Sequence, residues 1–147
     1  MNILIATDGS EFGRAAAVKA CELAAGRQDI VFTIVSAYDT PASIGAEPYV
    51  GTPEMYQQLI DGLRLLAERA VDEVKSIIEQ RFPNASITTV VEMGRAAEVI
   101  LDAADRVKAD LVVVGSHGHG FWGRSLLGSV SNAVVHHARC PVLVVRK

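Results

Sequence analysis

Short apolar runs alternate along the chain with longer segments of helical periodicity, and this alternation constrains the fold more than any other feature. The apolar runs are rich in β-branched residues and are closed by turn sequences, which is typical of buried strands. The segments between them repeat apolar residues at helical spacing. We expect strands at residues 2–7, 30–37, 86–92, 110–114 and 142–145, and helices at 15–25, from 53 to just before 83, 96–107 and 129–139.

This order of elements predicts an α/β domain with a parallel sheet that is covered by helices on both faces. The 147 residues match the size of one domain, 1–147, and show no internal repeat or linker. Ser10 is the expected N-cap of the first helix, and Thr52 followed by Pro53 is a favourable start for the second. The spacing predicts an inner stripe on that second helix formed by Leu59, Leu63, Leu66, Ala70, Val74, Ile77 and Ile78.

Composition excludes several protein classes. Half of the residues are apolar, yet we find no apolar run of 18 residues, so no transmembrane helix is expected. The opening MNILIATDGSE lacks a basic segment and reaches Asp8 early, so we expect no signal peptide. Cys21 and Cys140 fit no metal-binding spacing, and we interpret them as buried thiols in a reducing cytoplasm.

Charge is distributed unevenly. The net charge of −3 gives no argument for nucleic acid or membrane binding, and neither partner is expected. However, all 17 acidic residues lie between Asp8 and Asp110, whereas the stretch from Leu111 to Lys147 has none. A C-terminal quarter without carboxylates favours anion binding, because nearby carboxylates would repel the ligand. Chance in a short window with two buried strands is the alternative.

The loop before the last helix carries the strongest chemical signal. Residues 115–131 read GSHGHGFWGRSLLGSVS, and they follow a strand end, where open α/β sheets bind ligands. Glycines let backbone N–H groups approach phosphate oxygens, and a helix start adds free N–H groups and a favourable dipole. Ser129 and Ser131 add hydroxyl donors, and Arg124 could reach a terminal phosphate. An ordinary flexible loop is the alternative.

Two standard motifs resemble this loop and are rejected. Residues 118–123 spell GxGxxG, but the dinucleotide fingerprint belongs to the first strand–helix turn and needs a later acidic residue. Residues 123–129 resemble a P-loop without its Gly-Lys-Ser/Thr core. The histidine pairs at 117/119 and 136/137 lack a third ligand, so hydrogen-bonding or solvated roles are favoured over a metal site.

At this point the chain resembles the universal stress protein family, in the subclass that binds ATP. The spacing of Gly115, Gly118 and Gly128-Ser129 matches the long nucleotide-binding signature of that subclass. The stretches ILIATDGS, VEMGRAAEVI and CPVLVV extend the resemblance over essentially the whole chain.

The resemblance implies a Rossmann-like fold with strand order 3-2-1-4-5 and a bound adenine nucleotide, which is ATP, with ADP and AMP as alternatives. Asp8 matches the family aspartate near the ribose and the metal-bound phosphates, so it would act on Mg²⁺ or Mn²⁺ only through the nucleotide; helix capping is its other possible role. Ala37 matches the position whose backbone meets adenine. The expected binding residues are Ala6, Thr7, Asp8, Ala37, Gly115, Ser116, His117, Gly118, Arg124, Gly128, Ser129, Val130 and Ser131.

Three functions remain open from the sequence. The preferred one is a nucleotide-dependent sensor or regulator of the stress response, with slow or no ATP hydrolysis, because the loop has no phosphate-binding lysine and no obvious base. The alternatives are a weak ATPase activated by a partner and a structural interaction module without a ligand. The resemblance also implies a homodimer through the last strand, from Cys140 to Val145, because an apolar sheet edge favours pairing.

Overall fold

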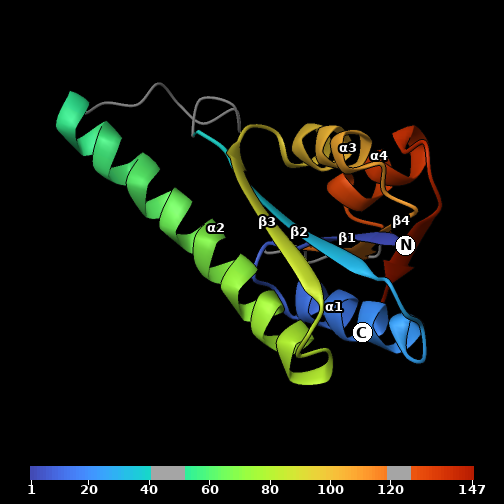
Figure 1. The fold of residues 1–147 in the computed structure, drawn as a ribbon. Helices are drawn as coiled ribbons and strands as arrows, with labels where there is room; N and C mark the ends of the chain where they lie inside the picture. The colour runs from blue at the N-terminus through green and yellow to red at the C-terminus, as the bar shows by residue number, and fades with distance from the viewer. Residues whose placement is uncertain (41–51, 119–126) are drawn as a thin grey trace.

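The computed structural model describes residues 1–40, 52–118 and 127–147, and in these ranges strands and helices alternate as predicted. The expected strand boundaries agree with the observed ones to within one residue. Figure 1 shows how these strands and helices are arranged in space. The elements are β1 (Asn2–Ala6), α1 (Glu11–Ala24), β2 (Val31–Tyr38), α2 (Pro53–Arg81), β3 (Ser86–Met93), α3 (Ala96–Val107), β4 (Leu111–Gly115), α4 (Ser129–His137) and β5 (Val142–Val145).

The five strands form one parallel sheet in the order β3-β2-β1-β4-β5, which confirms the expected topology. The chain adds β2 and β3 on one side of β1, and then crosses to add β4 and β5 on the other side. The order therefore reverses between β1 and β4, and the crevice beyond the carboxyl ends of such strands is the usual ligand position in open α/β sheets.

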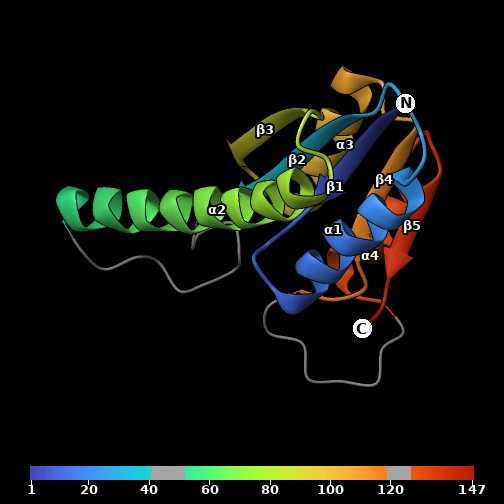
Figure 2. The same ribbon diagram turned by 60° about the horizontal axis from the view of Figure 1, so that its bottom comes forward.

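Alternate residues of the central strand β1 belong to two separate hydrophobic cores. Ile3 and Ile5 pack with α1 and α2 on one face, whereas Leu4 and Ala6 pack with α3 and α4 on the other. Figures 1 and 2 show these helix pairs on opposite sides of the sheet. Both faces are covered, which explains why the central strands are continuous apolar runs instead of alternating ones.

Helix α1 starts earlier than expected, at Glu11 instead of residue 15. The Ser10 hydroxyl accepts a hydrogen bond from the backbone N–H of Gly13 at 3.3 Å, as predicted for an N-cap. The cap sets the helix start, whereas the buried alanine stripe that suggested position 15 begins one turn later. Helix α4 ends at His137 instead of residue 139, because Ala138 is already extended (ψ 141°) and Pro141 disfavours helical backbone before it.

Helix α2 begins as predicted, with the Thr52 hydroxyl accepting from the Met55 N–H and Pro53 in the first turn. The predicted inner stripe is wrong at its N-terminal end, where Leu59 and Leu66 are exposed. The helix has 29 residues, or about 43 Å, whereas the eight-residue strand β3 spans about 26 Å. Its N-terminal half therefore extends beyond the sheet, as Figure 2 shows.

The two cysteines differ in their environments. Cys21 is buried in α1, as expected, and burial raises the pKa of its thiol. Cys140 is only partly buried, because it precedes the edge strand β5, so its predicted full burial is wrong. None of the helices in the described ranges is long and apolar enough to cross a membrane.

Candidate functional site

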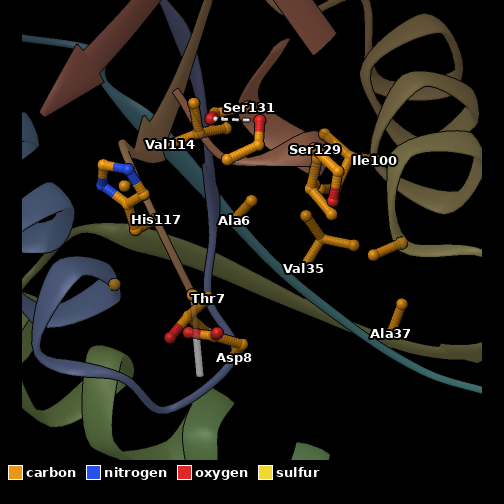
Figure 3. A pocket seen from close by; sticks show the side chains of 16 residues that line it. Ala6, Thr7, Asp8, Val35, Ala37, Ile100, Val114, His117, Ser129 and Ser131 are labelled. Atoms are coloured by element: carbon orange, nitrogen blue, oxygen red, sulfur yellow. Dashed lines mark hydrogen bonds between the residues drawn. The ribbon is translucent and has the colours of Figure 1, made fainter. Parts of the chain in front are cut away.

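A cavity of about 380 Å³ opens at the carboxyl ends of β1, β2 and β4, where the strand order reverses (Figure 3). The starts of α3 and α4 close its other sides. Its described lining consists of Ala6, Thr7, Asp8, Gly13, Val35, Ala37, Ala96, Ile100, Val114, Gly115, His117, Gly118, Gly128, Ser129, Val130 and Ser131.

The predicted site residues that the structure describes all line this cavity, with one exception. Ser116 is 1% exposed, and its backbone links the surrounding elements instead of lining the space. Arg124 lies outside the described residues, as do His119 and the rest of 119–126. Segments that are more than 100 residues apart in the sequence, such as the turn at Asp8 and the glycine at 118, thus come together.

The turn after β1 is held by its own side chains. The Asp8 carboxylate accepts a hydrogen bond from the Ser10 N–H at 3.0 Å, and the Thr7 hydroxyl accepts from the Gly9 N–H at 3.2 Å. Gly9 has a left-handed backbone (φ 80°), which its lack of a side chain permits. The turn therefore fixes Asp8 at the mouth of the cavity. The helix cap is Ser10 and not Asp8, whose carboxylate instead holds the turn that precedes the helix.

Gly118 lies directly against Asp8. A Cβ atom added at Gly118 would fall 2.4 Å from Oδ2 of Asp8, which is far inside van der Waals contact. A side chain at 118 would therefore displace the Asp8 carboxylate, which is the end of an exposed side chain. The sequence predicted a close approach of the loop backbone to a ligand, which this contact does not test. Glycine at 115 meets a different constraint, because a Cβ added there would lie 2.9 Å from the backbone of Phe12. The absence of a side chain at Gly115 lets β4 pack against the start of α1.

The N-terminus of α4 faces the cavity with its first backbone N–H groups. Its N-cap is Gly128, and within the described residues no side chain makes a capping hydrogen bond to it and no acidic residue stands in its first turn. Free N–H groups and the positive end of the helix dipole favour an anion at this point. The Gly128 N–H itself donates to the carbonyl of Ser116 at 2.7 Å, which closes the base of the loop.

His117 is positioned by two neighbours. Its ring contacts the ring of Phe12 with centroids 5.5 Å apart, and its Nδ1 lies 3.0 Å from the Ser116 hydroxyl. In α4, Nδ1 of both His136 and His137 lies 2.8 Å from a backbone carbonyl oxygen one turn earlier, which confirms the hydrogen-bonding roles expected for that pair. No group of three or more potential metal-ligating side chains occurs in the described part of the chain.

Sequence reasoning missed five lining residues: Gly13, Val35, Ala96, Ile100 and Val114. One of them carried a usable signal, because Val35 shares a strand face with the predicted Ala37 through the alternation of side chains along β2. Ile100 stands one helical turn after Ala96 on α3, but Ala96 was itself missed. Gly13 is required because an added Cβ would lie 2.6 Å from the Thr7 hydroxyl, a contact that sequence spacing does not reveal.

With this geometry in place, comparison with known proteins identifies the family. The model of the universal stress protein family matches residues 1–146. The chain belongs to the universal stress protein family.

Individual members of the universal stress protein family support this assignment along the whole chain. A relative from Thermus aquaticus is 36% identical over 145 residues, which cover 98% of this chain and 97% of the relative. The solved structure of UspA from Lactobacillus plantarum has a TM-score of 0.81 and 26% identity, over 99% of this chain and 97% of that one. A universal stress protein solved in complex with cAMP has a TM-score of 0.63 and 26% identity, over 99% of this chain and 96% of that one.

Proposed function

We propose that this universal stress protein binds an adenine nucleotide, with ATP as the expected ligand, and acts as a nucleotide-dependent sensor or regulator in the stress response. The observation that carries the proposal is that one cavity joins an apolar wall to the N-terminus of α4. Its volume of about 380 Å³ lies within the range of small-molecule sites.

The phosphate groups belong at the end of the cavity formed by Gly118 and Ser129. Backbone N–H groups of the loop and of the first turn of α4 supply the donors, and the helix dipole adds a favourable field. From residue 111 to 147 the chain has no acidic side chain, and among the described lining residues Asp8 is the one carboxylate. The donors are backbone groups, and binding here therefore depends on loop geometry more than on any one side chain.

The base belongs against the apolar side of the cavity. Val35, Ala37 and Ile100 line it from β2 and α3, as Figure 3 shows. An aromatic ring gains free energy by leaving water for such a surface, and the end of β2 can offer backbone groups at Ala37. The family member solved with cAMP is a further support for an adenine ring in this fold.

Asp8 fits a nucleotide in two ways. Its carboxylate can accept a ribose hydroxyl, or it can act on a divalent cation, Mg²⁺ or Mn²⁺, that accompanies the phosphates. The described residues near Asp8 do not form a ligand cluster of their own. A cation would therefore take its remaining ligands from phosphate oxygens and water, as expected from the sequence. Asp8→Ala should accordingly weaken nucleotide binding mainly when the cation is present.

Hydrolysis is expected to be slow or absent. Phosphoryl transfer needs charge neutralisation and an oriented nucleophile, and residues 115–131 contain no lysine. A single-turnover assay with labelled ATP tests this point. A rate near 1 s⁻¹ or above, about the lower end of ordinary enzyme turnover, would favour the ATPase alternative instead.

We further propose a homodimer through β5. This strand pairs with β4 on one side only, and Val142, Leu143 and Val144 are only partly buried. An apolar, unpaired sheet edge favours association with a second copy. Light scattering at micromolar concentration should give twice the monomer mass, and a monomer would contradict the proposal.

Calorimetric titration with ATP, ADP, AMP, cAMP and GTP tests the binding proposal. We expect adenine nucleotides to bind and GTP to bind more weakly. Replacing Gly118 and Gly128 together by valine should weaken ATP binding by well over tenfold, because side chains would occupy the approach to the backbone. Absence of any nucleotide binding by the folded wild-type protein would refute the proposal and favour a ligand-free interaction module.

A further inference from the structure

The two serines in the first turn of α4 have different surroundings, although the sequence suggests the same role for both. Ser129 is exposed at the mouth of the cavity, whereas Ser131 is only 3% exposed. Figure 3 shows both side chains beside the cavity, with a hydrogen bond drawn from Ser131. The difference in burial indicates that only Ser129 offers its hydroxyl freely to a ligand.

The Ser131 hydroxyl is engaged with the protein backbone. Its Oγ donates to the carbonyl of Ser116 at 3.0 Å and lies at the same distance from the carbonyl of Gly128. A hydroxyl has one proton, which these two carbonyl oxygens share. Phosphate oxygens are acceptors, so Ser131 has no second proton to donate to them.

These contacts join the two ends of the glycine loop. The Ser116 carbonyl receives both the Ser131 hydroxyl and the Gly128 N–H, the latter at 2.7 Å. Ser116 in turn donates its own N–H to the carbonyl of Val145 on β5 at 2.7 Å. Gly128 packs against the same segment, since an added Cβ would lie 3.2 Å from the Ser116 carbonyl.

We propose that Ser131 is a positioning residue that sets the distance between the Gly118 segment and the start of α4, and that it acts without donating to the phosphate. This inference rests on the proposed nucleotide binding. Because the ligand needs N–H groups from both segments at once, holding them together before binding lowers the ordering cost of the complex. Without the Ser131 hydroxyl, the Gly128–Ser116 backbone bond is the remaining described hydrogen bond between Ser116 and the start of α4.

The first experiment uses the protein without nucleotide. Amide hydrogen exchange is measured by NMR for wild type, Ser131→Ala and Ser129→Ala. We expect Ser131→Ala to speed exchange of the Gly128 N–H about three- to tenfold, which corresponds to the loss of one buried hydrogen bond, while core amides such as Val113 keep their protection. Ser129→Ala should leave the Gly128 rate unchanged. An unchanged Gly128 rate in Ser131→Ala would overturn the inference.

The second experiment compares adenosine and ATP as ligands. Ser131→Ala should weaken ATP about tenfold and leave adenosine unchanged, and Ser131→Thr, which keeps the hydroxyl, should restore ATP affinity. Ser129→Ala should also weaken ATP, but without the change in Gly128 exchange. Equal loss for adenosine and ATP, or no loss, would contradict the positioning role. If Ser131→Ala does not fold, Ser131→Cys, with a weak donor of similar size, should show the same exchange and affinity changes.

The two experiments separate this inference from the proposed function. If wild-type protein binds neither adenosine nor ATP, the proposed function fails, and the exchange rates still show whether Ser131 holds the loop base. If wild type binds ATP but Ser131→Ala behaves like wild type in both measurements, the proposed function stands and the positioning role is wrong.

Discussion

Replacing Gly118 by alanine tests the contact between the loop and the turn after β1. The added Cβ would lie 2.4 Å from Oδ2 of Asp8, about 1 Å closer than an ordinary contact. Gly118 is not among the glycines with a left-handed backbone, so the cost is steric. The clashing atom is the end of an exposed side chain, so the clash is relieved when the Asp8 carboxylate turns, which weakens its bond to the Ser10 N–H. We expect the free energy of unfolding to fall by about 1 kcal/mol, the contribution of one hydrogen bond.

Urea unfolding and ATP titration measure the two consequences. Moving Asp8 displaces a group that lines the cavity, so ATP affinity should fall at least tenfold in Gly118→Ala. The matched control is Gly62→Ala on α2, where an added Cβ meets nothing within 4 Å. This control should stabilise the protein by about 0.5–1 kcal/mol, since alanine favours helix, and should leave ATP affinity unchanged.

A double-mutant cycle decides whether Asp8 is the cause. In an Asp8→Ala background the obstructing carboxylate is gone, so Gly118→Ala should then cost less than about 0.5 kcal/mol. If Gly118→Ala costs the same with and without the Asp8 carboxylate, the two residues are independent and the reasoning about their contact is refuted.

Two further variants test the packing of α1. Ser10→Ala removes the cap that accepts the Gly13 N–H, so urea unfolding should show a loss of about 1 kcal/mol in the free energy of unfolding. Ser76→Ala, at an exposed position of α2, should change that free energy by less than about 0.5 kcal/mol. Equal effects of the two substitutions would show that the cap contributes nothing. Burial raises the pKa of the Cys21 thiol above its ordinary value, so at alkaline pH the unfolded state loses the thiol proton first and stability falls as the pH rises. Unfolding at pH 8 and pH 10 should therefore show a larger loss for wild type than for Cys21→Ala, and an identical loss would contradict the assigned burial.

Most of the fold could be predicted because local and global signals agree. Ser10, Thr52 and Pro53 mark helix starts by chemistry that acts within one turn. Five apolar runs separated by helices leave few topologies, and the resemblance to a known family selected the strand order. The predicted burial of Leu59 and Leu66 on α2 is wrong, because helical spacing identifies the inner face of a helix but does not show where the sheet beneath that face ends.

The site could be predicted in position but not in detail. Glycine spacing and the absence of acidic residues after Asp110 both indicated the loop at 115–131. The pairing of Gly118 with Asp8 depends on the placement of β1 beside β4, which no local pattern encodes. The different surroundings of Ser129 and Ser131 likewise depend on which hydroxyl lies next to the Ser116 carbonyl, and that is a property of the folded loop.

The central claim is that backbone N–H groups of the glycine loop and of α4 hold the phosphates of an adenine nucleotide. The most direct test is an NMR titration of the ¹⁵N-labelled protein with ATP, followed at the amides of Gly118, Ser129 and Val130. The account predicts the largest downfield amide proton shifts at these positions with ATP and much smaller ones with adenosine. Equal shifts with both ligands, or shifts confined to residues outside the cavity, would contradict it.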